Sequence, residues 1–325
     1  MERLHLIENW LNDLYPGATF SLEPASSDAS FRRYFRVKFG DRSLIVMDAP
    51  PSREDCRPFL KVAELFAKSG LHLPEVLEKD LDKGFLLLSD LGSTTYLDRL
   101  DEANADLLYR DAIDSLVKMQ QASIPGLLPE YDEALLRREM NLFPEWYLKQ
   151  HLGEIVTEEN QAILGRVFSK IVENCLAQPK VFVHRDYHSR NLMLTEPNPG
   201  ILDFQDAVYG PITYDLVSLL RDAYISWEEE KVLDWAIRYW EKARAAGLPV
   251  SGDFAQFYRD FEWMGAQRQL KVLGIFARLH HRDGKAQYLD DIPLVLSYLR
   301  KTCMRYSELS PLLRVLGKLE VGTTF

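Results

Sequence analysis

Cysteine is scarce in this chain of 325 residues, which carries only Cys56, Cys175 and Cys303. Their odd number and wide spacing exclude a disulfide framework and a cysteine-based metal site, and they suit a reducing cytoplasm. No segment approaches the roughly 20 consecutive apolar residues of a membrane span. The acidic N-terminal segment also lacks the apolar core of a signal peptide. We therefore expect a cytoplasmic protein with no membrane partner.

Positive charge is also in deficit, because 39 Lys and Arg face 49 Asp and Glu, for a formal net charge of −10. This balance argues against nonspecific binding to nucleic acid or to anionic membranes. Internal repeats and low-complexity tracts are absent, and no obligatory protein partner is evident. The remaining composition, 46% hydrophobic and 27% charged, is that of a globular protein, long enough for two lobes.

Three polar residues with a fixed spacing are the most informative feature that is present. Asp186 and Asn191 are five positions apart and follow the apolar run 181–183, and Asp203 comes twelve residues later, after the apolar pair 201–202. This layout matches the catalytic loop and metal-binding strand of kinase-like phosphotransferases. An ordinary turn between two strands is the alternative, since such residues are good turn formers.

Phosphoryl transfer explains why these residue types are needed. The transferred group carries diffuse negative charge, so the protein mainly positions it and supplies cations. Magnesium prefers hard oxygen ligands, which Asn191 and Asp203 provide. Asp186 would instead lie near the acceptor hydroxyl, as a base or an orienting group. We expect short strands on both sides of the loop, which would bring the three residues to one edge.

The pattern of apolar and turn residues predicts an α+β protein with two lobes. Residues 1–92 should form a small nucleotide-binding lobe, with helices at 2–14 and 58–69 and strands at 19–24, 31–39, 43–47, 74–79 and 84–89. Residues 93–325 should form a mostly helical catalytic and acceptor-binding lobe, with helices at 97–121, 129–151, 158–177, 214–223, 227–246, 253–282 and 292–309. This is the protein-kinase-like architecture, in which the active site lies between the lobes.

Most of the chain resembles the aminoglycoside phosphotransferase and choline kinase superfamily. Within it, the chain looks most like the bacterial anomeric sugar kinases of cell-wall recycling, on four segments: 30–37, 47–51, 142–147 and 267–279. The resemblance implies ATP and Mg²⁺ as cofactors. It also implies a small-molecule sugar substrate, N-acetylmuramic acid and/or N-acetylglucosamine, phosphorylated on the C1 hydroxyl.

The expected phosphate site departs from the kinase pattern in two ways. The third expected strand ends with residues 45–48 and lacks the Lys that usually holds the ATP phosphates. We expect Arg32 or Arg33 to replace this Lys, or the loop amides and magnesium to hold the phosphates without it. The loop before these arginines has no glycine. Its Ser27 and Ser30 could still contribute to an anion-binding nest for ATP.

Other residues take their expected roles from the same resemblance. Ser89, Asp90 and Leu91 fall where the interlobe hinge would meet adenine; a plain strand end and turn is the alternative. Asp215 would brace the catalytic loop, which is compatible with a carboxylate at a helix N-terminus. His188 could contact the acceptor or serve as an ordinary polar loop residue.

A basic helix face could hold the acceptor. One predicted helix contains four basic residues with no acidic residue between them: Arg268, Lys271, Arg278 and Arg282. The ordinary interpretation is that these charged side chains form a solvent-exposed helix face. Alternatively, Arg268 and Lys271 could bind the lactyl carboxylate of N-acetylmuramic acid. Glu145 and Trp146 could contact a sugar through a carboxylate and a ring face, or could be ordinary helix residues.

Two kinds of alternative function stay open at this point. The acceptor could be another one of the superfamily, such as an aminoglycoside, choline or homoserine. Cationic acceptors favour acid-lined pockets, so the basic helix face around Arg268 and Lys271 disfavours them. A nucleotide-binding pseudokinase would explain the missing strand Lys, but the intact Asp186, Asn191 and Asp203 argue against it.

Overall fold

The computed structural model describes residues 2–26 and 32–317, and the chain divides into two compact units. One unit contains Met1–Arg99 and Asn191–Asp206, and the other contains Leu100–Arg190 and Ala207–Phe325. The first break thus falls at Arg99 and not at residue 92. In addition, the segment with both expected metal ligands belongs to the first unit, whereas the sequence suggested the second lobe.

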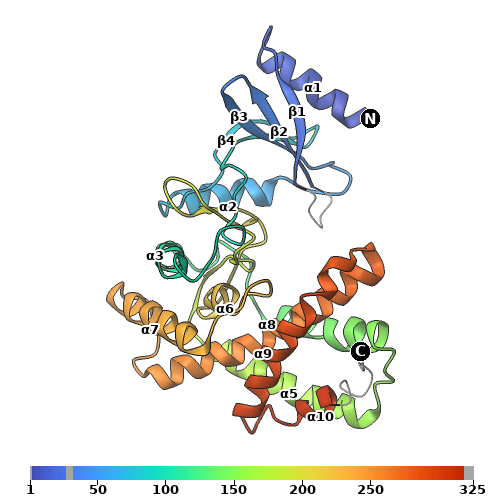
Figure 1. Ribbon diagram of the computed structural model, residues 1–325, viewed down its shortest axis with the longest axis vertical. Helices are drawn as coiled ribbons and strands as arrows, with labels where there is room; N and C mark the ends of the chain where they lie inside the picture. The colour runs from blue at the N-terminus through green and yellow to red at the C-terminus, as the bar shows by residue number, and fades with distance from the viewer. Residues whose placement is uncertain (1, 27–31, 318–325) are drawn as a thin grey trace. The chain divides into compact units, whose positions relative to one another are not determined.

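A five-stranded antiparallel sheet within the described residues forms the frame of the first unit (Figure 1). The five strands were expected from the alternating apolar pattern, and their order in the sheet is β1-β2-β3-β5-β4. The strands are β1 (Ser21–Ser26), β2 (Arg33–Phe39), β3 (Arg42–Asp48), β4 (Val76–Asp80) and β5 (Phe85–Ser89). The turn between β2 and β3 sets their register, in which Tyr34 pairs with Met47.

Two helices cover apolar surface in this unit. The amphipathic helix α1 (Glu2–Leu14) packs Ile7, Trp10 and Leu11 against the sheet, in a core with Val37 and Phe85. The second helix, α2 (Arg57–Ala67), packs its Phe59 and Phe66 rings 4.8 and 6.3 Å from the ring of Phe204. The Phe204 contact ties the returning segment Asn191–Asp206 to the N-terminal part of the chain.

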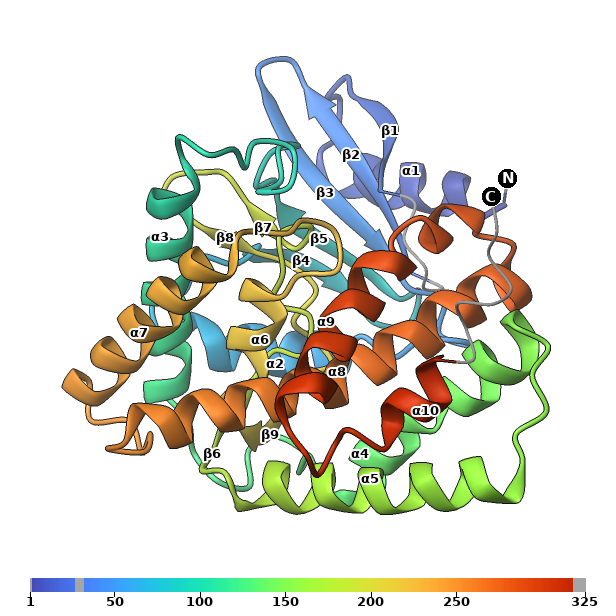
Figure 2. The same cartoon turned by 60° about the horizontal axis from the view of Figure 1, so that its bottom comes forward.

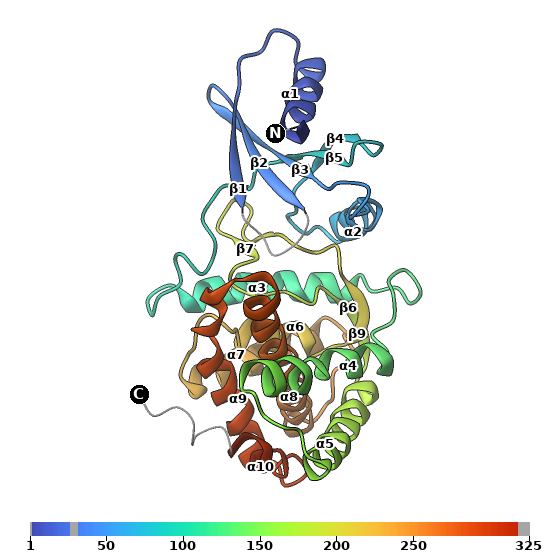
Figure 3. The ribbon, with the colours of Figure 1, turned by 90° about the vertical axis from the view of Figure 1, so that its right-hand side faces the viewer.

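The second unit is mostly helical and is organised around the 30-residue helix α8 (Phe254–Asp283) (Figures 2 and 3). Helix α8 contacts most of the elements around it. The described elements are α3 (Ala105–Gln121), α4 (Glu133–Met140), η1 (Phe143–His151), α5 (Glu158–Ala177), α6 (Tyr214–Leu220), α7 (Glu229–Ala245), η2 (Ala286–Leu289), α9 (Ile292–Arg305) and α10 (Leu312–Gly317). Gly274 allows the close approach of η1, because a Cβ there would lie 2.3 Å from the Leu142 carbonyl carbon.

Three expected helices differ from the observed ones. The helix expected at 129–151 is divided into α4 and the π-helical η1, because Pro144 has no N–H to continue the hydrogen-bond ladder. The helix expected from residue 97 begins only at Ala105, after a turn that the Asp101 carboxylate holds. The last expected helix ends at Arg305, and α10 follows as a separate short helix.

Short strands flank the motif on both sides, as its spacing predicts. In the second unit, β6 (Lys180–Val183) pairs with β9 (Val208–Pro211). In the first unit, β7 (Leu192–Met193) pairs with β8 (Gly200–Ile201). None of the helices within residues 2–26 and 32–317 combines the length with the hydropathy that a membrane span requires.

Candidate active site

The loop that carries Asp186 follows strand β6 and is held by a buried carboxylate. Asp215, at the start of α6, accepts hydrogen bonds from the backbone N–H groups of His184 (2.6 Å) and Arg185 (3.0 Å). Burial raises the pKa of Asp215 to about 7, and these two N–H donors act in the opposite direction. Arg185 has a φ of +79°, a conformation that is costly for a residue with a side chain. The two hydrogen bonds therefore fix a strained turn directly before Asp186.

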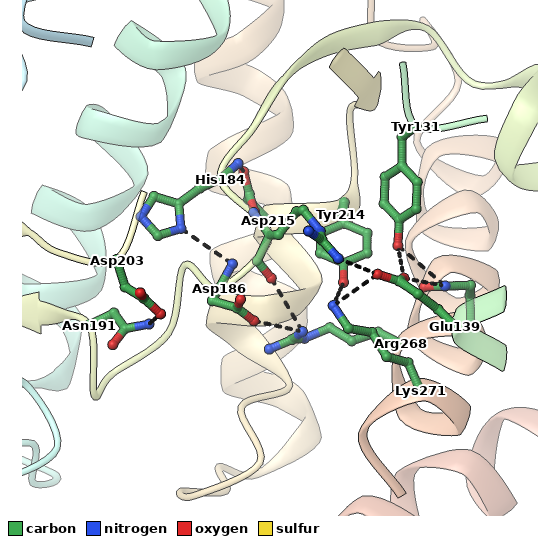
Figure 4. A network of polar contacts seen from close by, with 12 residues as sticks. Tyr131, Glu139, His184, Asp186, Asn191, Asp203, Tyr214, Asp215, Arg268 and Lys271 are labelled. Atoms are coloured by element: carbon green, nitrogen blue, oxygen red, sulfur yellow. Dashed lines mark hydrogen bonds and ion pairs between the residues drawn. The ribbon is translucent and has the colours of Figure 1, made fainter. Parts of the chain in front are cut away.

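Asp186 is placed beside cations from helix α8 (Figure 4). Its Oδ1 lies 3.8 Å from Nη1 of Arg268, which also donates to the Arg185 carbonyl at 3.4 Å. Desolvation raises the pKa of Asp186, but Lys271 and Arg268 outweigh it and hold the pKa well below its usual range. The Asp186 side chain is still 38% exposed. It is therefore an ionised carboxylate that is partly accessible to solvent.

A buried ionic network extends from this loop to helix α4 (Figure 4). Lys271 places its ammonium 3.4 Å from Oε1 of Glu139 and donates to the hydroxyl of Tyr214 at 2.9 Å. Glu139 also accepts hydrogen bonds from Arg185 and, at 3.2 Å, from Gln267. Burial raises the pKa of Glu139, but Lys271 and Arg185 outweigh it, so the net pKa is lowered. Every charge in this network has a partner of opposite sign.

The basic face of α8 therefore does not have the form that the sequence suggested. Arg268 and Lys271 are only 5% and 4% exposed, so the interpretation of a solvated face is wrong for both. Their charges face Asp186 and Glu139. Arg278 is half-buried, and the exposed Arg282 pairs with its neighbour Asp283 at 2.8 Å. The assignment of Arg268 and Lys271 to the acceptor stays a prediction, and these contacts count against it.

Asn191 and Asp203, in the first unit, lie beside each other across the β7–β8 pair (Figure 4). Nδ2 of Asn191 donates to Oδ2 of Asp203 at 3.4 Å, and Nε2 of Gln205 donates to Oδ1 at 2.7 Å. Asp203 has a φ of +62°, the second strained residue of the motif. An amide and a carboxylate are hard donors that fit part of a Mg²⁺ site, whose other ligands are usually water and phosphate. No self-contained cluster of three metal-ligating side chains occurs in the described part of the chain.

The two arginine candidates for the phosphates differ in their surroundings. Arg33, the first residue of β2, is bound to Asp48, with Nε 3.1 Å from Oδ2. Asp48 is fully buried at the end of β3 and also accepts a hydrogen bond from Nε of Arg3 at 2.8 Å. Arg32 lies just before β2, with Nη2 4.0 Å from a carboxylate oxygen of Asp206. The carboxylate that ends β3 therefore takes up the charge of Arg33.

The remaining nucleotide candidates are partly engaged within the first unit. Ser27 and Ser30 lie outside the described residues. Ser89 pairs with Glu75 through both its N–H and its Oγ, at 2.9 and 2.8 Å. Asp90 forms a bidentate ion pair with Arg36, whose Nε donates to Oδ2 at 2.6 Å and whose Nη2 donates to Oδ1 at 3.0 Å.

Because the side chains of Ser89 and Asp90 are engaged in these contacts, the predicted binding of adenine at the hinge can involve only backbone groups of residues 89–91. Burial raises the pKa of Asp90, but the hydrogen bonds from Arg36, Ser43 and the Gly92 N–H, together with the charge of Arg36, outweigh it and lower the net pKa, so the carboxylate stays ionised and paired. Leu91 is buried. A nucleotide at Ser89–Leu91 would thus meet main-chain donors and acceptors, while the Asp90 side chain holds the turn.

The other three candidate acceptor residues lie in the Asp186 loop and on η1. His188 is 9% exposed, and its backbone N–H donates to the Asp186 carbonyl at 3.1 Å. Its Nδ1 is buried without a hydrogen-bond partner among the described residues. Glu145 is exposed and Trp146 half-buried on η1. Of these three residues, His188 is the one that lies beside Asp186, in the same loop.

Glu139, whose carboxylate forms an ion pair with Lys271, was not predicted from the sequence. A signal was present, because Glu139 lies three residues after Leu136 and next to Met140, on the buried side of α4. A carboxylate at a core position requires a buried cation. Its partner, however, is 132 residues away in the sequence (271 − 139).

Comparison with known proteins identifies the family to which the chain belongs. The phosphotransferase enzyme family matches residues 21–250. The N-acetylmuramate/N-acetylglucosamine kinase of Pseudomonas aeruginosa is 53% identical over 322 residues, which cover 99% of this chain and 94% of that protein. The protein of the same name from Neisseria meningitidis is 52% identical, with full coverage of both chains.

Solved structures show the fold. The choline kinase LicA from Streptococcus pneumoniae matches with a TM-score of 0.66 and 13% identity, over 93% of this chain and all of that one. The ADP-bound aminoglycoside phosphotransferase APH(2'')-Ib matches with a TM-score of 0.60 and 15% identity, over 91% and 98%. With the curated relatives and the family match, these findings establish that the chain has the kinase-like bilobal fold, belongs to the phosphotransferase enzyme family and is a kinase.

Proposed function

We propose that this kinase transfers the γ-phosphoryl group of ATP to the anomeric hydroxyl of N-acetylmuramic acid, N-acetylglucosamine or both, and releases the sugar 1-phosphate. The observation that carries the proposal is the identity of 52–53% to two N-acetylmuramate/N-acetylglucosamine kinases over nearly the whole chain. The sugar, the cytoplasmic location and the use of ATP with Mg²⁺ are parts of this proposal.

Asp186 would act on the acceptor. Its pKa is held below the usual range, so at neutral pH it accepts a hydrogen bond from the hydroxyl and orients the oxygen for attack. A carboxylate of low pKa is a weak base for an ordinary alcohol. The anomeric hydroxyl is the most acidic hydroxyl of a sugar, because the ring oxygen stabilises its conjugate base. The low pKa of Asp186 therefore suits transfer to C1.

Asn191 and Asp203 would hold the magnesium. When bound, the metal would neutralise charge on the phosphate oxygens and orient the transferred group. Arg32 is the better candidate for a phosphate contact, because the charge of Arg33 is taken up by Asp48. The cations around Asp186 also disfavour choline and aminoglycosides as acceptors, since each would bring a further positive charge.

The test is an ATP-consumption assay with each sugar, followed by ³¹P and ¹H NMR of the product. The expected product carries phosphate on C1. Phosphate on C6, or turnover only with aminoglycosides or amino alcohols, would overturn the substrate proposal and leave the kinase assignment intact.

A pair of variants tests the role of Asp186. Asp186→Asn should lower kcat about 10²–10⁴-fold while ATP affinity, measured by calorimetry, stays close to that of the wild type. Asp234→Asn is the matched control, because Asp234 is an exposed carboxylate on α7 that pairs with Arg238. Wild-type kcat in Asp186→Asn would remove the residue from the reaction.

A further inference from the structure

Arg190, at the end of the Asp186 loop, carries an exposed guanidinium that is stacked on an aromatic ring. Its Cζ lies 3.6 Å from the ring centroid of Tyr224 and 5.8 Å from that of Tyr288. Within the part of the chain that the structure describes, Arg190 forms no ion pair, in contrast to Arg268 and Lys271. Stacking occupies the face of a guanidinium and leaves its in-plane N–H groups able to bind an anion.

The ring under Arg190 is held by further aromatic contacts. Tyr224 lies 6.0 Å from Phe276 of α8, and Phe276 lies 5.3 Å from Tyr288 of η2. The ring of His188 meets Tyr224 edge-on at 5.4 Å. We call these five residues the Arg190 cluster. Because Tyr224 packs against residues of α8 and of the Asp186 loop, the ring on which Arg190 is stacked is held in place by packing.

A buried carboxylate ties the loop to the aromatic ring. Asp222 accepts hydrogen bonds from the N–H groups of Ser189 at 2.9 Å and of Tyr224 at 3.1 Å. The loop residues His188 and Ser189 are both buried. The His188 Nδ1 and Ser189 Oγ atoms nevertheless have no hydrogen-bond partner among the described residues. Buried polar atoms are almost always paired in native proteins, with other protein groups or with water, so these two atoms need a partner from outside the described chain, a water or a ligand.

We propose that the Arg190 cluster binds the lactyl carboxylate of N-acetylmuramic acid, with Arg190 as the cation and His188 Nδ1 as a hydrogen-bond partner of the same acceptor. The proposal rests on the proposed sugar substrate. His188 is two residues from Asp186 and bonds to its carbonyl, so an acceptor held by the cluster is close to the carboxylate that orients the hydroxyl. Arg190 is then a specificity-determining residue, because N-acetylglucosamine has no carboxylate for it to bind.

The experiment compares kcat/KM for N-acetylmuramic acid, its methyl ester and N-acetylglucosamine in the wild type, Arg190→Met and Arg190→Lys. Arg190→Met should lose about ten- to a hundredfold more activity with the acid than with either neutral sugar, the loss typical of a charge-assisted hydrogen bond. Arg190→Lys should fall between, because it keeps the charge but not the stacked plane. Arg238→Met is the matched control on α7, where the exposed Arg238 pairs with Asp234.

The outcomes separate this proposal from the one on which it rests. Equal losses for the acid and the neutral sugars in Arg190→Met would overturn the role of the cluster while the sugar kinase stands. Turnover of N-acetylglucosamine with none of the acid would do the same. Turnover of neither sugar by the wild type would overturn both proposals.

Discussion

Replacement of Lys271 by Met tests whether this lysine is part of the buried network or part of an acceptor site. The wild-type ammonium is 4% exposed and lies 3.4 Å from Glu139. Removal of one partner from a buried ion pair typically costs about 3–5 kcal/mol, because the other charge is left uncompensated. Arg185 still bonds to Glu139 in the variant, so we expect the low end, about 3 kcal/mol. For a unit of this size, that is a fall in Tm of roughly 6–12 °C.

A double-mutant cycle would distinguish the interaction energy of the Lys271–Glu139 ion pair from the free energy lost through poorer packing. Urea unfolding of Lys271→Met, Glu139→Gln and the double variant gives the three free-energy changes. Because the two groups are in contact, the double variant should be more stable than the sum of the single changes predicts, by roughly 0.5–3 kcal/mol. Lys149→Met on η1 is the control, because it removes an exposed lysine.

The same variant has a kinetic signature. Lys271 helps to hold the pKa of Asp186 low, so in Lys271→Met the acidic fall in kcat/KM should begin at a higher pH than in the wild type. The ratio of kcat/KM for N-acetylmuramic acid to that for N-acetylglucosamine should not change. A loss of stability below about 1 kcal/mol, or an additive cycle, would refute the network. A selective loss with N-acetylmuramic acid would show that Lys271 binds the acceptor.

Three further predictions concern the first unit and the acid stability of the protein. Asp203→Ala should need far more Mg²⁺ or be inactive at any concentration, measured as a Mg²⁺ titration of turnover; unchanged Mg²⁺ dependence would remove Asp203 from the metal site. Arg32→Ala should raise KM for ATP, whereas Arg33→Ala should chiefly lower Tm because it leaves the buried Asp48 with one cation fewer; equal, small effects on KM would favour phosphate binding by backbone and metal alone. The pKa of Glu139 is lower in the folded protein than in the unfolded chain, so the ionised carboxylate stabilises the fold fully above the unfolded pKa of about 4.3, and this stabilisation is lost as the pH falls through the folded pKa. The difference in urea unfolding midpoint between the wild type and Glu139→Gln should therefore become smaller from pH 7 to pH 3.5. A difference that stays constant would contradict the lowered pKa.

The parts of the site that could be predicted are those whose partners are close in the sequence. Asp186 and Asn191 follow strand β6, and Asp203 follows β8, so apolar runs and spacing are enough to find them. The sheet of the first unit is also mostly local, since three of its four strand pairs join strands that are consecutive in the chain. Patterns of this kind depend only on nearby residues.

The parts that could not be predicted depend on distant pairing. The burial of Lys271 follows from Glu139 and Tyr214, which come from other elements. The end of α4 was missed for a different reason: an amphipathic pattern continues through Pro144, but the hydrogen-bond ladder does not. The engagement of Arg33 by Asp48 was missed because a charged strand end gives no sign of its partner.

The discontinuity of the first unit has a consequence for how the protein is made. The chain leaves this unit after Arg99, contributes 91 residues (100–190) to the other unit, and returns for only 16 (191–206). During synthesis from the N-terminus, the sheet can form early, but Phe204 reaches the rings of Phe59 and Phe66 only after about twice that length has been produced. An N-terminal fragment ending at Arg99 would therefore expose the apolar surface that Phe204 covers in the complete protein. Exposed apolar surface of this kind favours aggregation or chaperone binding.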